Sequence, residues 1–334
     1  MNVLEIRGFG LDALAPAERP EPTPGPGQVL LKLRAASLNY RDLMIVRGQY
    51  NPKLRFPRIP LSDGVGEVVA LGEGAEGVAI GNRVAGLFMP GWREGALTEA
   101  KSRTALGDGV DGLLAEYAVL PADGVVAVPP HLSDEEAACL PCAAVTAWNA
   151  LVVGGGIQAG DVVLVQGTGG VSLFALQFAR MHGARVIATS SSDEKLARAI
   201  ALGASDGVNY RANPDWGRHV RQLAGGQGVD HVVEVGGAGT LAQSLMAVKV
   251  GGHIALIGVL AGMGQFDPLP VLMKSVRLQG VYGGSGAMFA AMNRAIALAG
   301  MRPVVDRVFP FDEAREALQH MAGGSHFGKV ALRF

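Results

Sequence analysis

The sequence has few cysteines, no clustered charge and no long apolar run. Its 334 residues carry a formal net charge of −1 and contain no block of like charges. This argues against nucleic acid as the main partner, because phosphate binding needs a clustered basic surface. No stretch reaches about 18 consecutive apolar residues, so no membrane span is expected. The first ten residues include Glu5 and Arg7 and lack the apolar core of a signal peptide, so we expect a cytoplasmic protein.

Cys139 and Cys142 are the two cysteines, spaced C-x-x-C in a segment (133–151) that is expected to be mostly helical, with a break at Pro141. A redox pair normally follows a strand and opens a helix. A structural zinc site needs four ligands, and the sequence has neither a second C-x-x-C nor a histidine pair. We interpret both cysteines as structural, with a redox pair and a metal site as the alternatives.

Glycine is the residue in excess, with 48 of 334 positions against a usual share of about 7%. In residues 1–125 the glycines separate short β-rich stretches, which favours a barrel or a sandwich. The expected strands lie within 27–39, 66–87 and 115–129. The segment 89–112 is polar and glycine-rich, and we expect it to be a long surface loop with room for one helical turn.

Residues 126–285 alternate strands with helices, which predicts βαβ units and a doubly wound parallel sheet. The expected strands are 161–167, 184–190, 207–210, 229–236, 253–259 and 276–284. The expected helices are 171–182, 193–203, 216–226 and 240–252. Ser191 is predicted to cap the second of these helices, with Glu194 completing a capping box, and Gly203 to end it.

The two halves predict two domains. The tail, 309–334, holds one amphipathic helix and a final strand, and we expect it to return to the first half. The first domain is therefore predicted to comprise residues 1–125 and 286–334, and the second 126–285. The chain length and the 49% hydrophobic content are sufficient for two such cores.

Three glycines are crowded where a strand becomes a helix, in "VLVQGTGGVSLFALQFA" (163–179). Such a loop lets backbone N–H groups approach a dinucleotide pyrophosphate at a helix N-terminus. Ser172 stands where the usual pattern has its third glycine, and it is small enough for close packing of helix on strand. The alternative is a tight turn that binds nothing. The predicted contacts with the pyrophosphate are Gly167, Thr168, Gly169, Gly170 and Val171.

The end of the second strand discriminates between the two nicotinamide cofactors. An NAD-binding protein places an acid on the ribose there, whereas this chain has Ser190 and Ser191, and its first acid, Asp193, is already inside the helix. Lys195 is one turn into that helix and is a candidate partner for a 2′-phosphate, with a solvated surface lysine as the alternative. We therefore predict NADPH rather than NADH. Two further glycines are predicted to lie where ligands bind such sheets, at the ends of the fourth and fifth strands: Gly236 and Gly258.

These features resemble the medium-chain dehydrogenase/reductase superfamily over nearly the whole chain. Two stretches, "AASLNYRDLMIVRGQY" (35–50) and "IPLSDGVGEVVALGEG" (59–74), resemble the N-terminal signatures of its quinone oxidoreductase branch. The stretch "LPCAAVTAWNAL" (140–151) resembles the helix leading to the cofactor domain. The resemblance implies an α/β protein with a doubly wound Rossmann sheet and a mostly β GroES-like barrel.

Zinc alcohol dehydrogenases of the superfamily hold catalytic zinc through a cysteine, a histidine and a second cysteine. The matching positions here are Asn39, Ser62 and Cys142. Only the last is a good ligand, and a catalytic zinc needs three. The four cysteines of the structural zinc lobe are also missing from residues 80–115. The resemblance thus implies a zinc-independent protein, in which Asp63 takes the acid position of the lost motif.

Catalytic residues are assigned by the same resemblance. Tyr50 matches the proposed proton-donating tyrosine of related enoyl-thioester reductases, with a cleft-wall aromatic as the alternative. Asn39 is a candidate hydrogen-bond partner of the substrate or of the cofactor amide. Tyr40 is the weaker candidate, because packing explains its position equally well.

Further cofactor contacts also follow from the resemblance. Thr146 matches a position near the nicotinamide, and Tyr210 matches a tyrosine beside the 2′-phosphate, with Arg211 as a candidate helper. Lys329, in "HFGKVAL", belongs to a stretch that resembles a C-terminal family motif.

The expected function is NADPH-dependent, zinc-independent hydride transfer to a small molecule, either a quinone or an α,β-unsaturated carbonyl compound. The alternatives are an alcohol dehydrogenase with an atypical zinc site at Cys142 and a non-catalytic NADPH-binding sensor. The resemblance implies a homodimer, formed by pairing of strand edges near 253–259, and gives no natural substrate.

Overall fold

The computed structural model of the chain describes residues 1–262 and 264–334. It contains two compact units. The first unit comprises Met1–Val145 and Gly284–Phe334, and the second comprises Thr146–Gly283.

The first unit extends beyond the expected boundary after residue 125 because helix α3 (Asp134–Ala138) packs on its strands. Asp134 pairs with Arg83 at 2.6 Å, and Glu135 pairs with Arg333 at 2.5 Å. A division after residue 125 would separate this helix from the sheet to which both ion pairs attach it.

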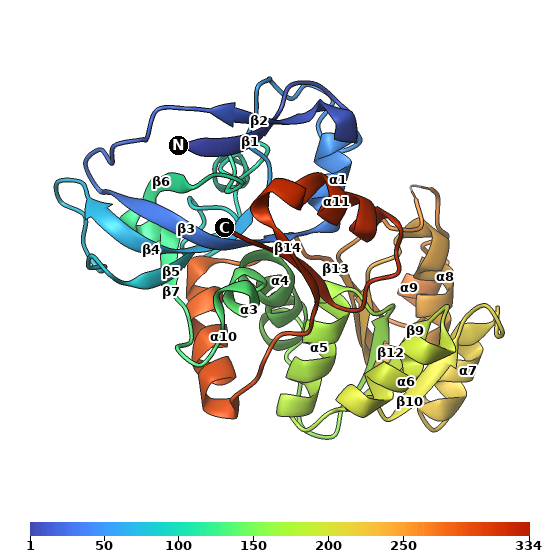
Figure 1. Cartoon of the computed structure of the whole chain (residues 1–334). Coiled ribbons are helices and arrows are strands. Elements are labelled where there is room, and N and C mark those ends of the chain that lie inside the picture. The colour runs from blue at the N-terminus through green and yellow to red at the C-terminus, as the bar shows by residue number, and fades with distance from the viewer. Residues whose placement is uncertain (263) are drawn as a thin grey trace. The chain divides into compact units, whose positions relative to one another are not determined.

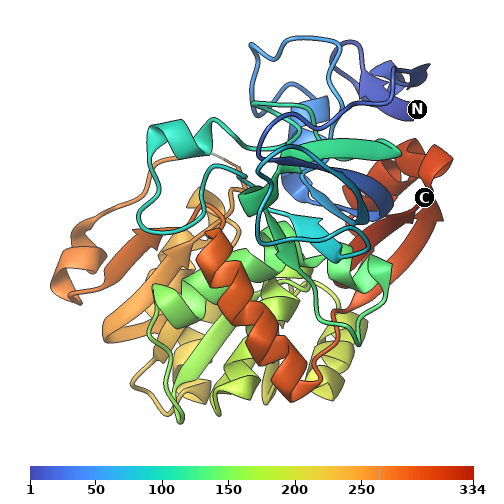
Figure 2. The same cartoon turned by 90° about the vertical axis from the view of Figure 1, so that its left-hand side faces the viewer.

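The second unit contains a six-stranded parallel sheet, which confirms the predicted fold class (Figure 1). In spatial order the strands are β10 (Asp206–Asn209), β9 (Arg185–Ser190), β8 (Val162–Gln166), β11 (Val229–Glu234), β12 (Val248–Leu256) and β13 (Arg277–Gly280). Numbered from β8 in chain order, this arrangement reads 3-2-1-4-5-6, the order of doubly wound dinucleotide-binding sheets. Strand β13 is an outer strand of the sheet, beside helix α9 (Leu269–Met273) (Figure 2).

Both faces of this sheet are buried at its central strand β8. The remaining helices of the unit, apart from the segment at its beginning, are α5 (Gly170–Met181), α6 (Asp193–Leu202), α7 (Trp216–Leu223) and α8 (Ala238–Ala247). Trp216 of α7 and Leu241 of α8 share one hydrophobic cluster with Leu164 of β8. The neighbours of Leu164 on the strand, Val163 and Val165, point to the opposite face and are also fully buried. Burial on both faces explains why β8 is an almost continuous apolar run.

The predicted cap of α6 is wrong by one residue. Ser192, not Ser191, is the N-cap, and its hydroxyl accepts a hydrogen bond from the Lys195 backbone N–H at 3.3 Å. Position N3 is therefore Lys195, so Glu194 does not complete a capping box. The predicted end is confirmed, because Gly203 closes the helix in the left-handed conformation with φ of 114°.

The first unit is built on a seven-stranded sheet. Its main order is β14 (Val305–Pro310), β15 (Lys329–Arg333), β3 (Gln28–Leu38), β4 (Asp63–Leu71), β5 (Arg83–Gly86) and β7 (Val125–Ala127), and β6 (Tyr117–Pro121) also pairs with β3. A separate two-stranded sheet joins β1 (Asn2–Ile6) and β2 (Leu14–Glu18). The expected return of the tail is confirmed, since β15 pairs antiparallel with β3 and places Val330 opposite Leu38.

Sequence reasoning missed several elements of this unit, among them strands β1 and β2, strand β14, which pairs parallel with β15, and helix α10 (Gly286–Ala299). The signals for α10 were present. Ser285 is its N-cap and accepts from the Met288 N–H, and Gly300 ends it at φ of 61°. The amphipathic tail helix was predicted and is α11 (Ala314–Ala322).

The segment 89–112 is only partly a surface loop. One helical turn is present, α2 (Glu99–Ser102), in agreement with the sequence. However, Met89, Trp92 and Ala105 are buried in a small hydrophobic cluster, so both ends of the segment are anchored.

The segment expected to be helical around Cys139 is helical. Its chain continues through Pro141 as a π-helical turn, Leu140–Ala144, and through α4 (Val145–Trp148). The wider turn accommodates a proline where an α-helix would kink. Within the residues that the structure describes, none of the helices is both long and apolar enough to cross a bilayer.

Candidate functional site

The glycine-rich loop of the second unit lies between β8 and α5, as predicted. Gly167 has φ of 69°, and Gly169 is the N-cap of α5. A Cβ added to Gly169 would have no atom within 4 Å, so this side of the loop is open to a ligand. The Ser172 hydroxyl donates to the Gln166 carbonyl at 2.6 Å and ties the helix to the strand where a third glycine was expected.

A dinucleotide pyrophosphate fits this loop. The first N–H groups of a helix have no partner within the helix, and α5 directs them toward the open side of the loop. The helix dipole adds a favourable potential for an anion. Gly167, Thr168, Gly169, Gly170 and Val171 supply this backbone and would hold the pyrophosphate.

The structure brings together the residues predicted to contact the 2′-phosphate. Asn209 of β10 lies opposite Ser190 of β9, and the Tyr210 N–H donates to the Ser190 carbonyl at 3.1 Å. Lys195 is in the first turn of α6, which begins directly after this strand end. Asp193, the first acid of this region, accepts a hydrogen bond from the Asn209 amide at 2.8 Å.

A buried carboxylate that sequence reasoning missed fixes the neighbouring strand end. Glu234, the last residue of β11, is fully buried. The N–H groups of Gly236 and Gly237 donate to it at 2.8 and 3.0 Å, and the hydroxyl of Thr240 donates at 2.5 Å. The remaining two donors are the Ser244 hydroxyl and the Gln166 amide, the latter at 2.8 Å. The available signal in the sequence was a glutamate at the end of the strand.

The two glycines predicted at these strand ends are demanded by the packing of the chain itself. A Cβ on Gly236 would lie 2.2 Å from the Thr240 hydroxyl, and one on Gly258 would lie 2.3 Å from the Val235 carbonyl. This close approach explains both glycines without a ligand. Thr146 is buried at the beginning of the second unit, in α4.

In the first unit, Asn39 is the N-cap of helix α1 (Tyr40–Val46). Its backbone N–H donates to the Asp42 carboxylate at 2.8 Å, and its side-chain Oδ1 accepts from the Lys329 ammonium at 2.7 Å. The other end of the amide, Nδ2, is buried and has no hydrogen-bond partner among the described residues. Helix α1 is rigidly placed because Leu43 lies in the main hydrophobic cluster of this unit.

Asp63 is the centre of a buried polar cluster beside Asn39. The Ser62 hydroxyl donates to it at 2.8 Å, and the Ser37 hydroxyl and the Cys142 N–H donate at 3.4 and 3.3 Å. The Lys329 ammonium pairs with it at 3.6 Å. The structure thus gathers Lys329 with all three positions that match zinc ligands in the family.

These three positions do not fit a metal. The Asn39 amide oxygen already accepts from Lys329, and the Ser62 hydroxyl already donates to Asp63. Burial raises the pKa of the Cys142 thiol far above its usual range, and the Asp63 carboxylate raises it further. Of the three positions, only Cys142 carries a side chain typical of zinc sites, whereas a catalytic zinc is held by three such ligands. Within residues 1–262 and 264–334, no group of three or more His, Cys, Asp or Glu side chains is arranged to hold a metal ion.

Tyr50 is half-buried next to Arg41, whose guanidinium carbon lies 4.9 Å from the centre of the tyrosine ring. Arg41 also lies 4.0 Å from the Asp42 carboxylate, which is fully buried. Burial raises the pKa of the Asp42 carboxyl to about 6, although neighbouring Arg41 opposes the shift. Arg41 therefore connects Tyr50 with the helix whose N-cap is Asn39.

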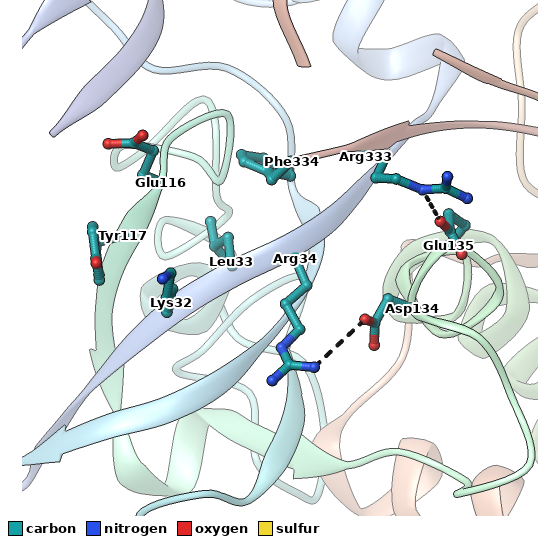
Figure 3. A pocket seen from close by; sticks show the side chains of 9 residues that line it. All are labelled: Lys32, Leu33, Arg34, Glu116, Tyr117, Asp134, Glu135, Arg333 and Phe334. Carbon is teal, nitrogen blue, oxygen red and sulfur yellow. Dashed lines mark hydrogen bonds and ion pairs between the residues drawn. The ribbon is translucent and has the colours of Figure 1, made fainter. Parts of the chain in front are cut away.

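A hollow of about 470 Å³ on the first unit contains none of the predicted site residues (Figure 3). Its lining is Lys32, Leu33, Arg34, Glu116, Tyr117, Asp134, Glu135, Arg333 and Phe334. Arg333 reaches across to Glu135, and Arg34 lies 4.0 Å from Asp134. Four of the charged side chains of this hollow are therefore paired with one another.

Comparisons with known proteins agree with the fold. A family model described as the alcohol dehydrogenase GroES-like domain matches residues 25–130, and one described as zinc-binding dehydrogenase matches residues 170–298. A zinc-type alcohol dehydrogenase-like protein of Schizosaccharomyces pombe is 44% identical over 98% of this chain and 97% of its own. An acryloyl-coenzyme A reductase of Metallosphaera sedula is 29% identical over 93% of this chain and 94% of its own.

Solved structures are similar over both units. A crystal structure of an NAD-dependent alcohol dehydrogenase has a TM-score of 0.91 at 36% identity, with complete coverage (100%) of both chains. A mycobacterial protein complexed with NADPH has a TM-score of 0.84 at 28% identity, again covering 100% of both.

A β-rich unit joined to a parallel dinucleotide-binding sheet defines a two-domain oxidoreductase of the alcohol dehydrogenase type. The chain belongs to the medium-chain dehydrogenase/reductase superfamily.

Proposed function

We propose that the protein is a zinc-independent, NADPH-dependent reductase of quinones or α,β-unsaturated carbonyl compounds. One observation carries the proposal. The positions that match the zinc ligands of relatives are occupied by an amide, a hydroxyl and a partly buried thiol. The amide and hydroxyl oxygens are engaged in hydrogen bonds to other side chains. An alcohol has little tendency to lose its proton at neutral pH without a metal, so reduction of an electron-poor acceptor is the reaction that these residues favour.

The choice of NADPH is supported by the neutral end of β9. Ser190 and Ser191 leave a 2′-phosphate unopposed by an acid, and Lys195 and Tyr210 lie beside them. The NADPH complex of the mycobacterial structure agrees with this choice, whereas the NAD-dependent structure favours the other cofactor. Cofactor preference is therefore measured directly in the experiment below.

NADPH, when bound, supplies a hydride. The residues of the chain then have two tasks with an enone, which receives the hydride at its β-carbon. The Asn39 Nδ2–H donates to the carbonyl oxygen, on which negative charge develops. The Tyr50 hydroxyl transfers its proton to the α-carbon, and the tyrosinate recovers a proton from water. The reduced product of a quinone takes its protons from water, so a quinone does not need the tyrosine.

The test is oxidation of NADPH by EDTA-treated protein with a panel of quinones and enones, with NADH measured in parallel. We expect turnover without added metal and a preference for NADPH. Activity restored only by zinc would favour an alcohol dehydrogenase using Cys142 with atypical ligands. Binding of NADPH without turnover of any acceptor would favour a sensor.

We further propose a homodimer formed along the outer strand β13. The expected location near 253–259 needs correction, because β12 lies between β11 and β13 and has no free edge. Near β13, helix α9 exposes Leu272 and Met273 at 74% and 73%. Exposed apolar side chains beside an open strand edge are typical of an association surface. Light scattering should give a dimer for the native protein and a monomer for Leu272→Glu.

We also expect the substrate to be a small molecule and the protein to be cytoplasmic. Cys139 and Cys142 are both unpaired thiols, which suits a reducing compartment. Fractionation of cells that produce the tagged full-length protein, with NADPH oxidation measured in each fraction, tests this location.

A further inference from the structure

Lys329 is a buried lysine at the first position of β15, with 3% of its surface exposed. Its ammonium donates to the Leu38 carbonyl and to Asn39 Oδ1, both at 2.7 Å, and lies 3.6 Å from the Asp63 carboxylate. Two of the three N–H groups of the ammonium are thus hydrogen-bonded, and the Asp63 carboxylate pairs with its charge at a distance too long for a hydrogen bond. Because the ammonium is buried, Lys329 acts on a ligand only through a neighbour, and its neighbour with a donor remaining is Asn39.

The ammonium determines which way the Asn39 amide faces. Since an ammonium donates and never accepts, the amide atom at 2.7 Å is the oxygen, and Nδ2 is at the other end. Nδ2 is buried without a hydrogen-bond partner in the described structure. Leaving a buried donor unsatisfied is costly, and such a group in a native protein calls for an explanation. A ligand oxygen that accepts from Nδ2 provides one.

Asn39 is fixed from two sides. Its side chain is held by Lys329, and its backbone N–H donates to Asp42 at 2.8 Å. Asp63 in turn holds Lys329, and it is itself held by Ser62 and by the Cys142 N–H. The amide is thus oriented before any ligand arrives, which is the condition for strong stabilisation of a developing charge.

We propose that Lys329 is a positioning residue that orients and polarises the Asn39 amide, so that Nδ2–H donates to the carbonyl oxygen of the acceptor. An ammonium on Oδ1 withdraws electron density from the amide and makes its N–H groups stronger donors, because linked hydrogen bonds polarise one another. A fixed cation thus acts on the carbonyl through one amide. The ligand is a carbonyl compound, and this choice of ligand rests on the proposed function.

The first readout does not depend on turnover. A ¹³C=O-labelled saturated ketone such as cyclohexanone is bound to the protein with NADP⁺, and its carbonyl stretch is recorded by difference infrared spectroscopy. We expect a shift to lower frequency in the native protein. The shift should disappear in Asn39→Ala, decrease in Lys329→Met and be largely retained in Lys329→Arg. An unshifted carbonyl in the native protein, or equal shifts in the native protein and Lys329→Met, would overturn the proposal.

The second readout is the rate of NADPH oxidation in a single turnover with an enone. We expect a decrease of about 100-fold in Asn39→Ala, as for the loss of one oxyanion donor, and of about 10-fold in Lys329→Met. The dissociation constants of NADPH and ketone should change little. A weaker NADPH affinity with an unchanged rate would mean that Lys329 binds the cofactor, and would overturn the proposal.

Two further variants separate positioning from folding. Lys329→Met combined with Asp63→Asn removes the ammonium without leaving a buried carboxylate unpaired. Arg333→Met is the matched control, because Arg333 is a basic residue of the same strand that pairs with Glu135. We expect the double variant to show the cooperative melting of a folded protein but to lose the shift of the carbonyl stretch. The control should be folded and should retain the shift. Absence of turnover in the native protein with a normal shift would contradict the proposed function and leave the positioning role supported.

Discussion

Two buried carboxylates, one in each unit, are both rich in hydrogen bonds but differ in what the bonds achieve. Glu234 accepts from five uncharged donors, two of them backbone N–H groups of the turn after β11. Asp63 accepts from three donors and holds an ammonium that continues to Asn39. The hydrogen bonds of the Glu234 cluster hold the backbone of the turn that follows β11. The Asp63 cluster instead ends at Asn39 Nδ2, a donor without a hydrogen-bond partner among the described residues. This difference supports our proposal that the Asp63 cluster presents a group to a ligand, whereas the Glu234 cluster fixes a loop.

The largest effect is expected at Tyr50, which belongs to the ligand-presenting side of this comparison. Tyr50→Phe removes the proposed proton donor and should lower kcat for an enone by about 100-fold or more. Quinone reduction should change little, because its product is protonated by water. Stopped-flow measurement of both reactions, with enone and quinone side by side, checks this.

Tyr40→Phe is the control for this prediction. Tyr40 opens helix α1 and is 40% exposed, so its hydroxyl should matter to neither reaction. A parallel loss of enone and quinone reduction in Tyr50→Phe would contradict the proton-donor role and indicate a packing role instead.

Glu234→Ala should affect stability rather than chemistry. It leaves five donors without their acceptor in a buried site, and we expect the free energy of unfolding of the second unit to fall by about 3 kcal/mol. Urea unfolding followed by tryptophan fluorescence measures this, since Trp148 and Trp216 both lie in that unit. Glu194→Ala, on the exposed first turn of α6, is the control, with a change below about 0.5 kcal/mol. Normal stability with lost turnover would reverse our assignment of the two clusters.

Asp42 gives the ligand-presenting side a pH dependence. Its folded pKa of about 6 lies above the ordinary value of 3.8. Below pH 3.8 the carboxyl is protonated in both the folded and unfolded states, and burial then has no electrostatic cost. As the pH rises to about 6 the unfolded state loses its proton first, so the free energy of unfolding decreases, by about 3 kcal/mol in total.

Asp42→Asn should abolish this decrease. We expect the difference in free energy of unfolding between the variant and the native protein to grow from pH 4 to pH 6 and then to level off. Urea unfolding at pH 4, 5, 6 and 7 gives the two profiles. Parallel profiles over this range would show that Asp42 does not titrate as described.

Sequence reasoning succeeded where one short stretch contains the whole signal. The strand, glycine turn and helix at 163–179 are contiguous, and the parallel sheet follows from the alternation of such stretches. The N-cap of α6 was misplaced because Ser190, Ser191 and Ser192 offer equivalent hydroxyls, and only the backbone conformation selects the last.

The polar cluster of the first unit was found only in part. Asn39, Ser62 and Cys142 came from a resemblance, but their connection depends on Lys329, which is 290 positions from Asn39. No periodicity or local spacing can pair residues so far apart, because their contact is made by β15 pairing with β3. Glu234 was missed for a related reason: a single acid at the end of a strand does not reveal that its donors come from three separate segments.

The smallest predicted effect concerns the choice of cofactor. Here the second unit is proposed to present side chains of its own to the 2′-phosphate of NADPH. Ser190→Asp places a carboxylate at the strand end where a 2′-phosphate is proposed, and it should lower the ratio of kcat/KM for NADPH over NADH by about 10-fold, the worth of one charge-assisted contact. Lys195→Met should lower kcat/KM for NADPH and leave kcat/KM for NADH unchanged. Glu194→Gln, on the same turn, is the control and should leave the ratio within about twofold. A ratio that already favours NADH in the native protein would show that the neutral serines do not select the 2′-phosphate. The residues at this strand end would then, like the Glu234 cluster, only hold the backbone in place.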